Sequence, residues 1–186
     1  MQRGTRWSGR TVAVTRAGGF IGSHLVVALA EHGDDPRALV DDRVDGSAGL
    51  LDELDPAHRS ALDVRSGDSR DADWVRRSLD VAAAVFHLGA LVGIPHRDRS
   101  PRDVVASDVN GTLHGLEGAR EHYCERAVHI STSEVYGSGR QSPMDERHPS
   151  SARSPDAATT TTGWASERRR TTSEPNGRWP TCSRRS

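Results

Sequence analysis

The sequence contains no lysine, and all 25 of its basic side chains are arginine. Because arginine stays protonated, no basic side chain of this protein can supply chemistry that needs a tunable ammonium group. Aromatic residues are also scarce, at 4% of the chain, and hydrophobic residues make up 34% against 27% charged residues. This polar composition indicates that part of the 186-residue chain does not join a core, although the length suffices for one domain.

Long apolar runs are missing as well. No stretch approaches the roughly 18 apolar residues of a membrane span, and the first ten residues lack the apolar segment of a signal peptide. The two cysteines, Cys124 and Cys182, show neither metal-site nor redox spacing and are interpreted as free thiols. The net charge of −1 gives no reason to expect nucleic acid or a membrane as a partner. We therefore expect a cytoplasmic protein without a metal site.

Residues 151–186 contain no Val, Ile, Leu, Met, Phe or Tyr. No apolar face of helical or strand period can be drawn there, so this tail is predicted to be disordered. It carries seven arginines and three acidic residues. The arginines beside Trp164 and Trp179 leave open a nucleic-acid patch, although a disordered tail would have the same composition.

The chain is organised around residues 11–29, TVAVTRAGGFIGSHLVVAL. A run rich in β-branched residues meets a glycine cluster and then an apolar segment at helical spacing, which predicts a strand, a tight turn and a helix. At such a junction, backbone N–H groups and the helix dipole can bind a pyrophosphate. The candidate dinucleotide contacts are Gly19, Phe20, Ile21 and Gly22. The alternative is that the glycines only serve a turn that needs a positive φ.

Strand and helix patterns alternate along the rest of residues 11–149. We predict strands at residues 37–40, 61–64, 81–88 and 127–130, and helices at residues 23–32, 72–79 and 101–121. Residues 81–88 are nearly all apolar and should form a central strand buried on both faces. The alternation predicts an α/β fold with a doubly wound parallel sheet of Rossmann type, after an extension at residues 1–10 and before the tail at residues 150–186.

Ligands of such sheets bind at the carboxyl ends of the strands. The candidate contacts at this edge are Asp41, Asp68, Ser69, Leu88 and Ala90. An acid after the second strand, here Asp41 or Asp42, accepts hydrogen bonds from the adenosine ribose and disfavours a 2′-phosphate. NAD is therefore expected in preference to NADP. The alternative is that Asp41 and Asp42 only solvate a loop.

Five motifs, VTRAGGFIGSHL, GDSRD, FHLGALVGIP, DVNGT and STSEVYG, strongly resemble the NAD-dependent epimerase/dehydratase family, the extended short-chain dehydrogenase/reductases that act on nucleotide sugars. The resemblance covers residues 11–149 and is greatest to nucleotide-sugar 4,6-dehydratases. It implies that Thr132 hydrogen-bonds the 4-oxygen of the sugar and that Glu134 is the carboxylate acting at C5 and C6. It also implies NAD as a bound cofactor and a nucleotide sugar as substrate, and it leaves open a homodimer or pairing with an intact homologue.

Several positions depart from the family pattern. Arg16 stands where the glycine fingerprint begins, which should strain the turn and weaken cofactor binding. Asp108 replaces the Asn of an N-V-x-G-T motif, and Gly89 replaces the first Ala of an H-L-A-A motif. Asp156 and Thr160 occupy the positions of the family's catalytic Tyr and Lys, so both catalytic groups are missing.

We therefore expect a truncated family member that lacks the C-terminal substrate lobe and is inactive, with 4,6-dehydration of a nucleotide sugar as the ancestral reaction. The abrupt loss of apolar residues near Ser150 suggests a shifted reading frame or a decayed gene. Two alternatives stay open at this point. The chain could be an NAD-binding regulatory or partner-binding module, or it could be an active enzyme with substituted catalytic residues.

Overall fold

The computed structural model describes residues 7–41, 45–90 and 101–131, and the single residues Tyr136, Pro143, Asp145 and His148. Its contacts divide the chain into two units, residues 1–129 and residues 130–186. The first unit holds every helix and strand described below. In the second unit the ring of Tyr136 lies edge-on to the ring of His148, with the ring centroids 5.7 Å apart.

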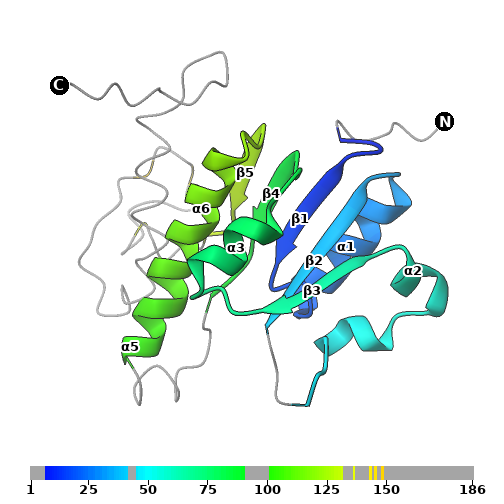
Figure 1. Ribbon diagram of the computed structural model, residues 1–186, viewed down its shortest axis with the longest axis horizontal. Helices are drawn as coiled ribbons and strands as arrows, with labels where there is room; N and C mark the ends of the chain where they lie inside the picture. The colour runs from blue at the N-terminus through cyan, green and yellow to red at the C-terminus, as the bar shows by residue number, and fades with distance from the viewer. Residues whose placement is uncertain are drawn as a thin grey trace. The chain divides into compact units, whose positions relative to one another are not determined.

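The first unit is built on a five-stranded parallel sheet with the strand order β3-β2-β1-β4-β5 (Figure 1). The strands are β1 (Thr11–Thr15), β2 (Asp35–Asp41), β3 (Asp63–Gly67), β4 (Ala84–His87) and β5 (Arg126–His129). From β1 the chain adds strands on one side as far as β3, and it then crosses over to add β4 and β5 on the other side. The carboxyl ends of β1 and β4 therefore flank the topological switch point, where open α/β sheets bind their ligands.

Alternate residues of the inner strands face two separate apolar cores. Val12 and Val14 of β1 pack with the residues of helix α1 (Phe20–Glu31) that face the sheet, on one side of it. Ala13 of the same strand faces the other side, where it packs with helices α3 (Ala72–Ser78) and α6 (Gly111–Glu121). These two helices also contact each other (Figure 1). The period-2 pattern of β1 thus places helices on both faces and confirms the predicted doubly wound fold.

The helices largely follow the predicted periodicity, with some additions. The predicted helix over residues 101–121 is present as α5 (Pro101–Val104), the π-helical segment η2 (Val105–Asn110) and α6. The π-helical turn had no signal in the apolar spacing. The connection from β2 to β3 contains two short elements that were not predicted, the 3₁₀ helix η1 (Gly49–Glu53) and helix α2 (Pro56–Ser60).

Three predicted boundaries were wrong. The helix after β1 begins at Phe20 and not at Ser23, because Gly19 is its N-cap. The third strand begins at Asp63 and not at residue 61, because the N–H of Ala61 still bonds the last turn of α2. The fourth strand is shorter than residues 81–88, because Val81 adopts a φ of 56° in the turn after α3. This strand, β4, is an inner strand as expected, but the middle position belongs to β1.

One inner strand carries a buried charge. The side chain of Arg37 in β2 is only 7% exposed, and its guanidinium lies 2.6 Å from carboxylate oxygens of both Asp63 and Asp80. It also donates to the carbonyl oxygens of Ser78 and Asp80, at 3.0 and 2.7 Å. A buried arginine is tolerated when its donors are satisfied in this way. Arg37 therefore ties β2 to β3 and to the C-terminal end of α3.

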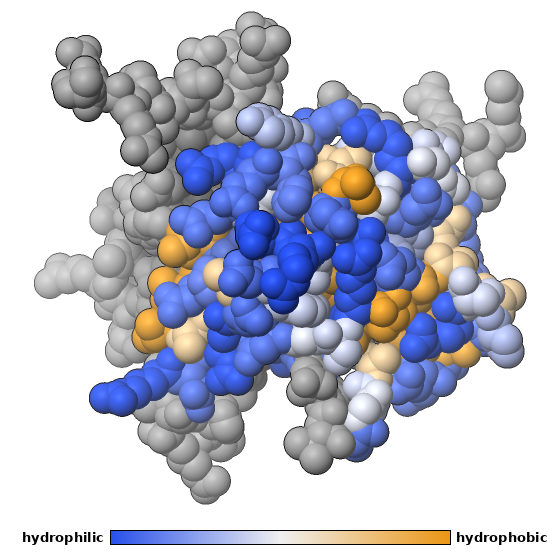
Figure 2. All heavy atoms as spheres, in the orientation of Figure 1, coloured by the Kyte–Doolittle hydropathy of each residue, from blue (hydrophilic) through white to orange (hydrophobic). Residues whose placement is uncertain are grey.

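The surface reflects the polar composition. The face drawn in Figure 2 is mostly hydrophilic, and its apolar residues form small separate patches. None of the helices in the part of the chain that the structure describes is long and apolar enough to cross a membrane.

Candidate functional site

The turn between β1 and α1 contains Arg16, the residue that departs from the expected glycine fingerprint. Arg16 has a φ of 54°, in the left-handed region that residues other than glycine rarely adopt. The N–H of Gly19 donates to the carbonyl oxygen of Arg16 at 3.0 Å and closes the turn. The strain expected from this substitution is thus present in the backbone. The neighbouring Gly18 does not relieve it, because the positive φ falls on Arg16 itself.

Two glycines of the turn are needed because other backbone groups pass close to them. A Cβ atom on Gly22 would clash with the carbonyl oxygen of Arg16 and lie 2.7 Å from Cα of Ala17. A Cβ atom on Gly18 would clash with the carbonyl oxygen of Ala48, next to η1. These contacts pack the first turn of α1 against the end of β1, and they bring η1 against the same turn.

The N-terminus of α1 is open to a ligand. Gly19, in an extended conformation, is its N-cap and makes no side-chain capping bond, and the first turn of the helix holds no acidic residue. The N–H donors of such a helix end attract anions. Phe20 and Ile21 in the same turn are exposed, as expected of apolar residues that a bound ligand covers. A dinucleotide pyrophosphate therefore fits this end of the helix.

A cleft of about 440 Å³ lies at the carboxyl ends of the strands, beside this turn. Its lining residues are Thr15, Arg16, Asp41, Gly67, Asp68, Ser69, Arg70, Gly89, Ala90, Asp103 and Ser107. Four of the candidate cofactor contacts predicted from sequence, Asp41, Asp68, Ser69 and Ala90, are among them. Leu88 does not line the cleft, but its N–H is bonded to Thr15, which does. A smaller pocket of about 80 Å³ lies between Asp41 and the turn that includes Gly19.

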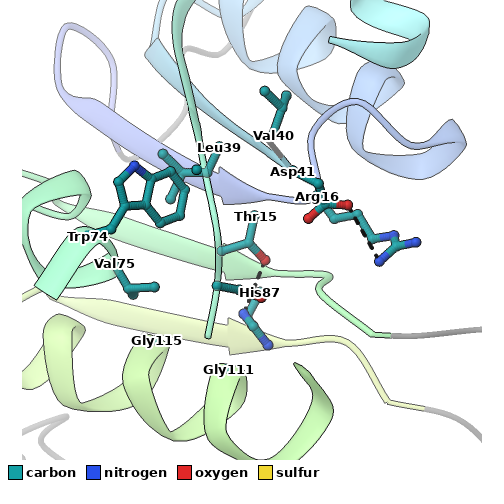
Figure 3. A pocket seen from close by; sticks show the side chains of 12 residues that line it. Thr15, Arg16, Leu39, Val40, Asp41, Trp74, Val75, His87, Gly111 and Gly115 are labelled. Atoms are coloured by element: carbon teal, nitrogen blue, oxygen red, sulfur yellow. Dashed lines mark hydrogen bonds and ion pairs between the residues drawn. The ribbon is translucent and has the colours of Figure 1, made fainter. Parts of the chain in front are cut away.

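Each acid of the cleft faces an arginine, which the sequence reasoning did not anticipate. Nη1 of Arg16 lies 3.8 Å from Oδ2 of Asp41 (Figure 3). Arg70 donates from Nε to Oδ2 of Asp68 at 2.8 Å, and its Nη1 lies 3.9 Å from Oδ1 of Asp103. The hydrogen bonds from Arg70 lower the pKa of Asp68 below its ordinary value. Asp68 therefore stays ionised and fixed in direction at the mouth of the cleft.

Beneath the cleft, buried hydroxyl groups hold the imidazole of His87 on both sides. Thr15 Oγ1 lies 3.1 Å from Nδ1 of His87 (Figure 3), and Nε2 of His87 lies 3.2 Å from Thr112 Oγ1. The Thr112 hydroxyl donates to the carbonyl oxygen of Asp108 at 2.6 Å, so its oxygen accepts from Nε2–H of His87. We therefore assign the ring proton to Nε2, which makes Nδ1 the acceptor for the Thr15 hydroxyl.

The Thr15 hydroxyl also holds the loop that follows β4. It accepts from the backbone N–H groups of Leu88 and Gly89, both at 3.1 Å, so its two lone pairs are used. Burial lowers the pKa of His87 to about 4, and repulsion from His129, whose ring stacks on it at 5.5 Å, acts in the same direction. His87 is therefore neutral at pH 7. The sequence gave no warning of this network, which joins β1, β4 and α6 through residues distant along the chain.

Residues 14–165 match a family profile described as GDP-mannose 4,6 dehydratase. The chain belongs to the NAD-dependent epimerase/dehydratase family. This confirms the resemblance carried by the five sequence motifs. The profile is named for a dehydratase, whereas the similar curated proteins described next are 4-epimerases.

Two plant relatives illustrate how much of this family's length the chain spans. It is 31% identical over 152 residues to UDP-glucuronate 4-epimerase 6 of Arabidopsis thaliana, covering 75% of this chain and 31% of that protein. It is 32% identical to UDP-glucose 4-epimerase 2 of Oryza sativa subsp. japonica, covering 78% of this chain and 37% of that protein. The chain therefore spans about a third of the length of these curated family members.

Solved structures of epimerases share the fold. A UDP-glucose 4-epimerase from Bifidobacterium longum, in complex with NAD⁺ and UDP, superposes with a TM-score of 0.76 at 22% identity, covering 91% of this chain and 50% of that one. A UDP-N-acetylglucosamine 4-epimerase from Methanobrevibacter ruminantium gives a TM-score of 0.72 at 25% identity, covering 89% and 52%. The sheet described above is thus the Rossmann-like sheet of the family.

The candidate catalytic residues are not placed by the structure. Thr132 and Glu134 lie outside the described residues, shortly after the end of β5, and so do Asp42, Asp156 and Thr160. Their expected roles in this family member stay predictions.

Proposed function

We propose that this chain binds NAD along the carboxyl edge of its sheet and corresponds to the cofactor-binding part of a nucleotide-sugar epimerase/dehydratase. The observation that supports this most is the 440 Å³ cleft, where four candidate contacts lie beside the open N-terminus of α1. Solved family members that contain NAD add support, among them a short-chain dehydrogenase/reductase superfamily protein from Agrobacterium tumefaciens with bound NAD, at 28% identity.

The residues divide the cofactor among them according to its chemistry. The N–H groups of the first turn of α1, from Gly19 to Gly22, would bind the pyrophosphate. Asp41 would accept hydrogen bonds from the adenosine ribose, and Asp68 and Ser69 would contact the adenine at the end of β3. Leu88 and Ala90 would contact the cofactor from the loop that Thr15 holds. When bound, NAD supplies an acceptor and donor of hydride.

We further infer that the family reaction on this scaffold is 4,6-dehydration of a nucleotide sugar. Thr132 would hold the sugar 4-oxygen, and Glu134 would exchange protons at C5 and C6, the role that a positioned carboxylate can fill. A second candidate reaction is 4-epimerisation, which is favoured by the names of the curated relatives. Analysis of the product distinguishes the two, because only dehydration yields a 4-keto-6-deoxy sugar.

We propose that the chain nevertheless does not turn over. Asp156 aligns with the family's catalytic Tyr, and its ordinary pKa of about 3.9 makes it a weak base at neutral pH. Thr160 aligns with the family's Lys, and no lysine occurs elsewhere in the sequence to replace it. The proposal also places the end of the folded domain near residue 149, so that limited proteolysis should cleave within residues 150–186 first.

Calorimetric titration of the full chain with NAD tests the binding proposal. We expect NAD to bind, and we expect Asp41→Ala to weaken it by about tenfold, because a charged hydrogen-bond acceptor for the ribose is lost. Asp73→Ala is the matched control, since Asp73 is an exposed acid on α3 that does not line the cleft. Absence of binding, or equal effects of the two substitutions, would refute the proposed site.

Incubation with UDP-glucose, UDP-glucuronate, UDP-N-acetylglucosamine, GDP-mannose and dTDP-glucose tests the catalytic proposal. We expect neither a 4-keto-6-deoxy product nor a 4-epimer. Formation of either product by the unmodified chain would show that Asp156 or another group serves as the base, and the proposed inactivity would then be wrong.

A further inference from the structure

The inference drawn here concerns the adenosine end of the proposed NAD site, and it rests on that proposed function. A carboxylate after the second strand selects NAD because it accepts from the ribose 2′-hydroxyl and repels a 2′-phosphate. In this structure Asp41 does not stand alone, since Nη1 of Arg16 lies 3.8 Å from its Oδ2 (Figure 3). The guanidinium offsets the charge on which the exclusion of a 2′-phosphate depends.

The contact leaves Arg16 free to bind an anion. At 3.8 Å the pair is an ion pair without a hydrogen bond, and a guanidinium has five N–H donors in a planar fork. The side chain of Arg16 is 37% exposed and that of Asp41 is 51% exposed, so both can be reached by a ligand. Ion pairs as exposed as this one are weak, and a phosphate can compete with the carboxylate for the same donors.

Space for such a group exists next to the pair. The pocket of about 80 Å³ is lined by Arg16 and Asp41 together with Gly18, Gly19, Val40, Ser47 and Ala48. It adjoins the turn at the start of α1, where the pyrophosphate would lie, and the end of β2, where the ribose would lie. The left-handed φ of Arg16 fixes this side chain in the turn itself, at the position where the family fingerprint has only a hydrogen atom.

We propose that Arg16 is a specificity-determining residue that gives the adenosine end a site for a 2′-phosphate, so that the chain accepts NADP as well as NAD. Arg16 supplies a planar donor pair to the phosphate, while Asp41 keeps its acceptor role toward the ribose of NAD. The preference for NAD that Asp41 alone would impose is thereby largely cancelled.

The test uses nucleotide fragments on the full chain, because the 2′-phosphate is then the only difference between ligands. The Kd values of adenosine 5′-monophosphate and adenosine 2′,5′-bisphosphate are measured by calorimetry at low salt, with NAD and NADP as the complete cofactors. For the unmodified chain we expect the two fragments to bind within about threefold of each other. For Arg16→Gly we expect the bisphosphate to weaken at least about tenfold relative to the monophosphate, because a charge-assisted pair of hydrogen bonds is lost.

Two further variants separate charge from backbone geometry. Arg16→Asn removes the charge but tolerates a left-handed φ, so it should change the ratio of the two Kd values as Arg16→Gly does. Arg76→Asn removes an exposed arginine on α3 that does not line the cleft, and it should leave the ratio unchanged.

The outcomes distinguish this inference from the proposed function. Normal binding of NAD and of the monophosphate, with exclusion of the bisphosphate by the unmodified chain, would overturn the inference alone. Equal changes in the two Kd values on Arg16→Gly would also overturn it. Binding of neither fragment and neither cofactor by any variant would overturn the NAD site itself, and the inference with it.

Discussion

The hydroxyl of Thr15, the last residue of β1, lies 3.1 Å from Nδ1 of His87, the last residue of β4. This contact joins the two strands that flank the switch point of the sheet, directly beneath the cleft. The same hydroxyl oxygen accepts two backbone N–H groups of the following loop. A protonated His87 would present a third N–H to an oxygen with no lone pair left, so the network stabilises only the neutral ring.

The first prediction follows from this network and concerns pH. Burial lowers the pKa of His87 in the folded chain to about 4, from an unfolded value near 6.5, so the unfolded state takes up the proton first. The contribution of His87 to stability is therefore complete above about pH 6.5 and is lost as the pH falls toward 4. The loss approaches about 1.4 kcal/mol per pH unit within this window. Urea unfolding at several pH values between 4.5 and 7.5 measures it.

His87→Gln is the informative variant for this prediction. It should weaken the chain at pH 7 and flatten the dependence of the unfolding free energy on pH. His24→Gln is the control, because the imidazole of His24 is exposed and bonded only locally in α1. If His87→Gln kept the slope of the unmodified chain, another group would be responsible for the acid sensitivity.

The second prediction compares two arginines that contact the same acids. Arg37 and Arg65 both lie within 3.3 Å of Asp63 and of Asp80, but the Arg65 side chain is 33% exposed whereas Arg37 is 7% exposed. Arg37→Met should lower the unfolding free energy by about 2 kcal/mol, because buried carbonyl groups lose their donor. Arg65→Met should cost less than about 1 kcal/mol. Thermal and urea unfolding of both variants decide; similar costs would contradict the assigned burial.

The third prediction concerns two glycines inside helices. Gly22→Ala should destabilise the chain by about 1–3 kcal/mol and weaken NAD binding, because its methyl group would push α1 away from the carbonyl oxygen of Arg16. Gly115→Ala in α6 is the matched control. Its methyl group would make an ordinary contact, 3.4 Å from Nδ1 of His87, and would favour the helix by up to about 1 kcal/mol. A stabilising Gly22→Ala would show that the turn can shift.

The fourth prediction concerns backbone strain. Arg16 and Tyr123 both have a φ of 54°, and Tyr123 lies exposed in the turn after α6, away from the cleft. Replacing either residue by glycine should raise the unfolding free energy by about 0.5–1 kcal/mol, after the extra freedom of glycine in the unfolded chain is subtracted. Only Arg16→Gly should also change nucleotide selectivity. Destabilisation by Tyr123→Gly would show that the strain is compensated locally.

Sequence reasoning recovered the fold because β1 and α1 carry strong period-2 and period-3.6 patterns, and because acids such as Asp41 and Asp68 follow their strands directly. It did not recover the pairings within the cleft. Whether Arg16 reaches Asp41 depends on the φ of one turn residue, which composition does not encode. The contact of Thr15 with His87 joins residues 72 apart in the chain. The early end of the predicted fourth strand depends on the positive φ of Val81, which β-branched residues rarely adopt.

The strand order also sets an order in time. Pairing β1 with β2 brings Thr11 to Asp35, whereas pairing β1 with β4 brings Val12 to Ala84 and closes a much longer loop. We expect β1, α1 and β2 to associate early in folding, so that Val40→Ala slows folding whereas Val85→Ala mainly speeds unfolding in stopped-flow measurements. The reverse assignment would place the nucleus at β4. The cleft, whose wall is completed by the loop after β4, is then the last part of the sheet edge to form, and nucleotide can bind only once that strand has docked.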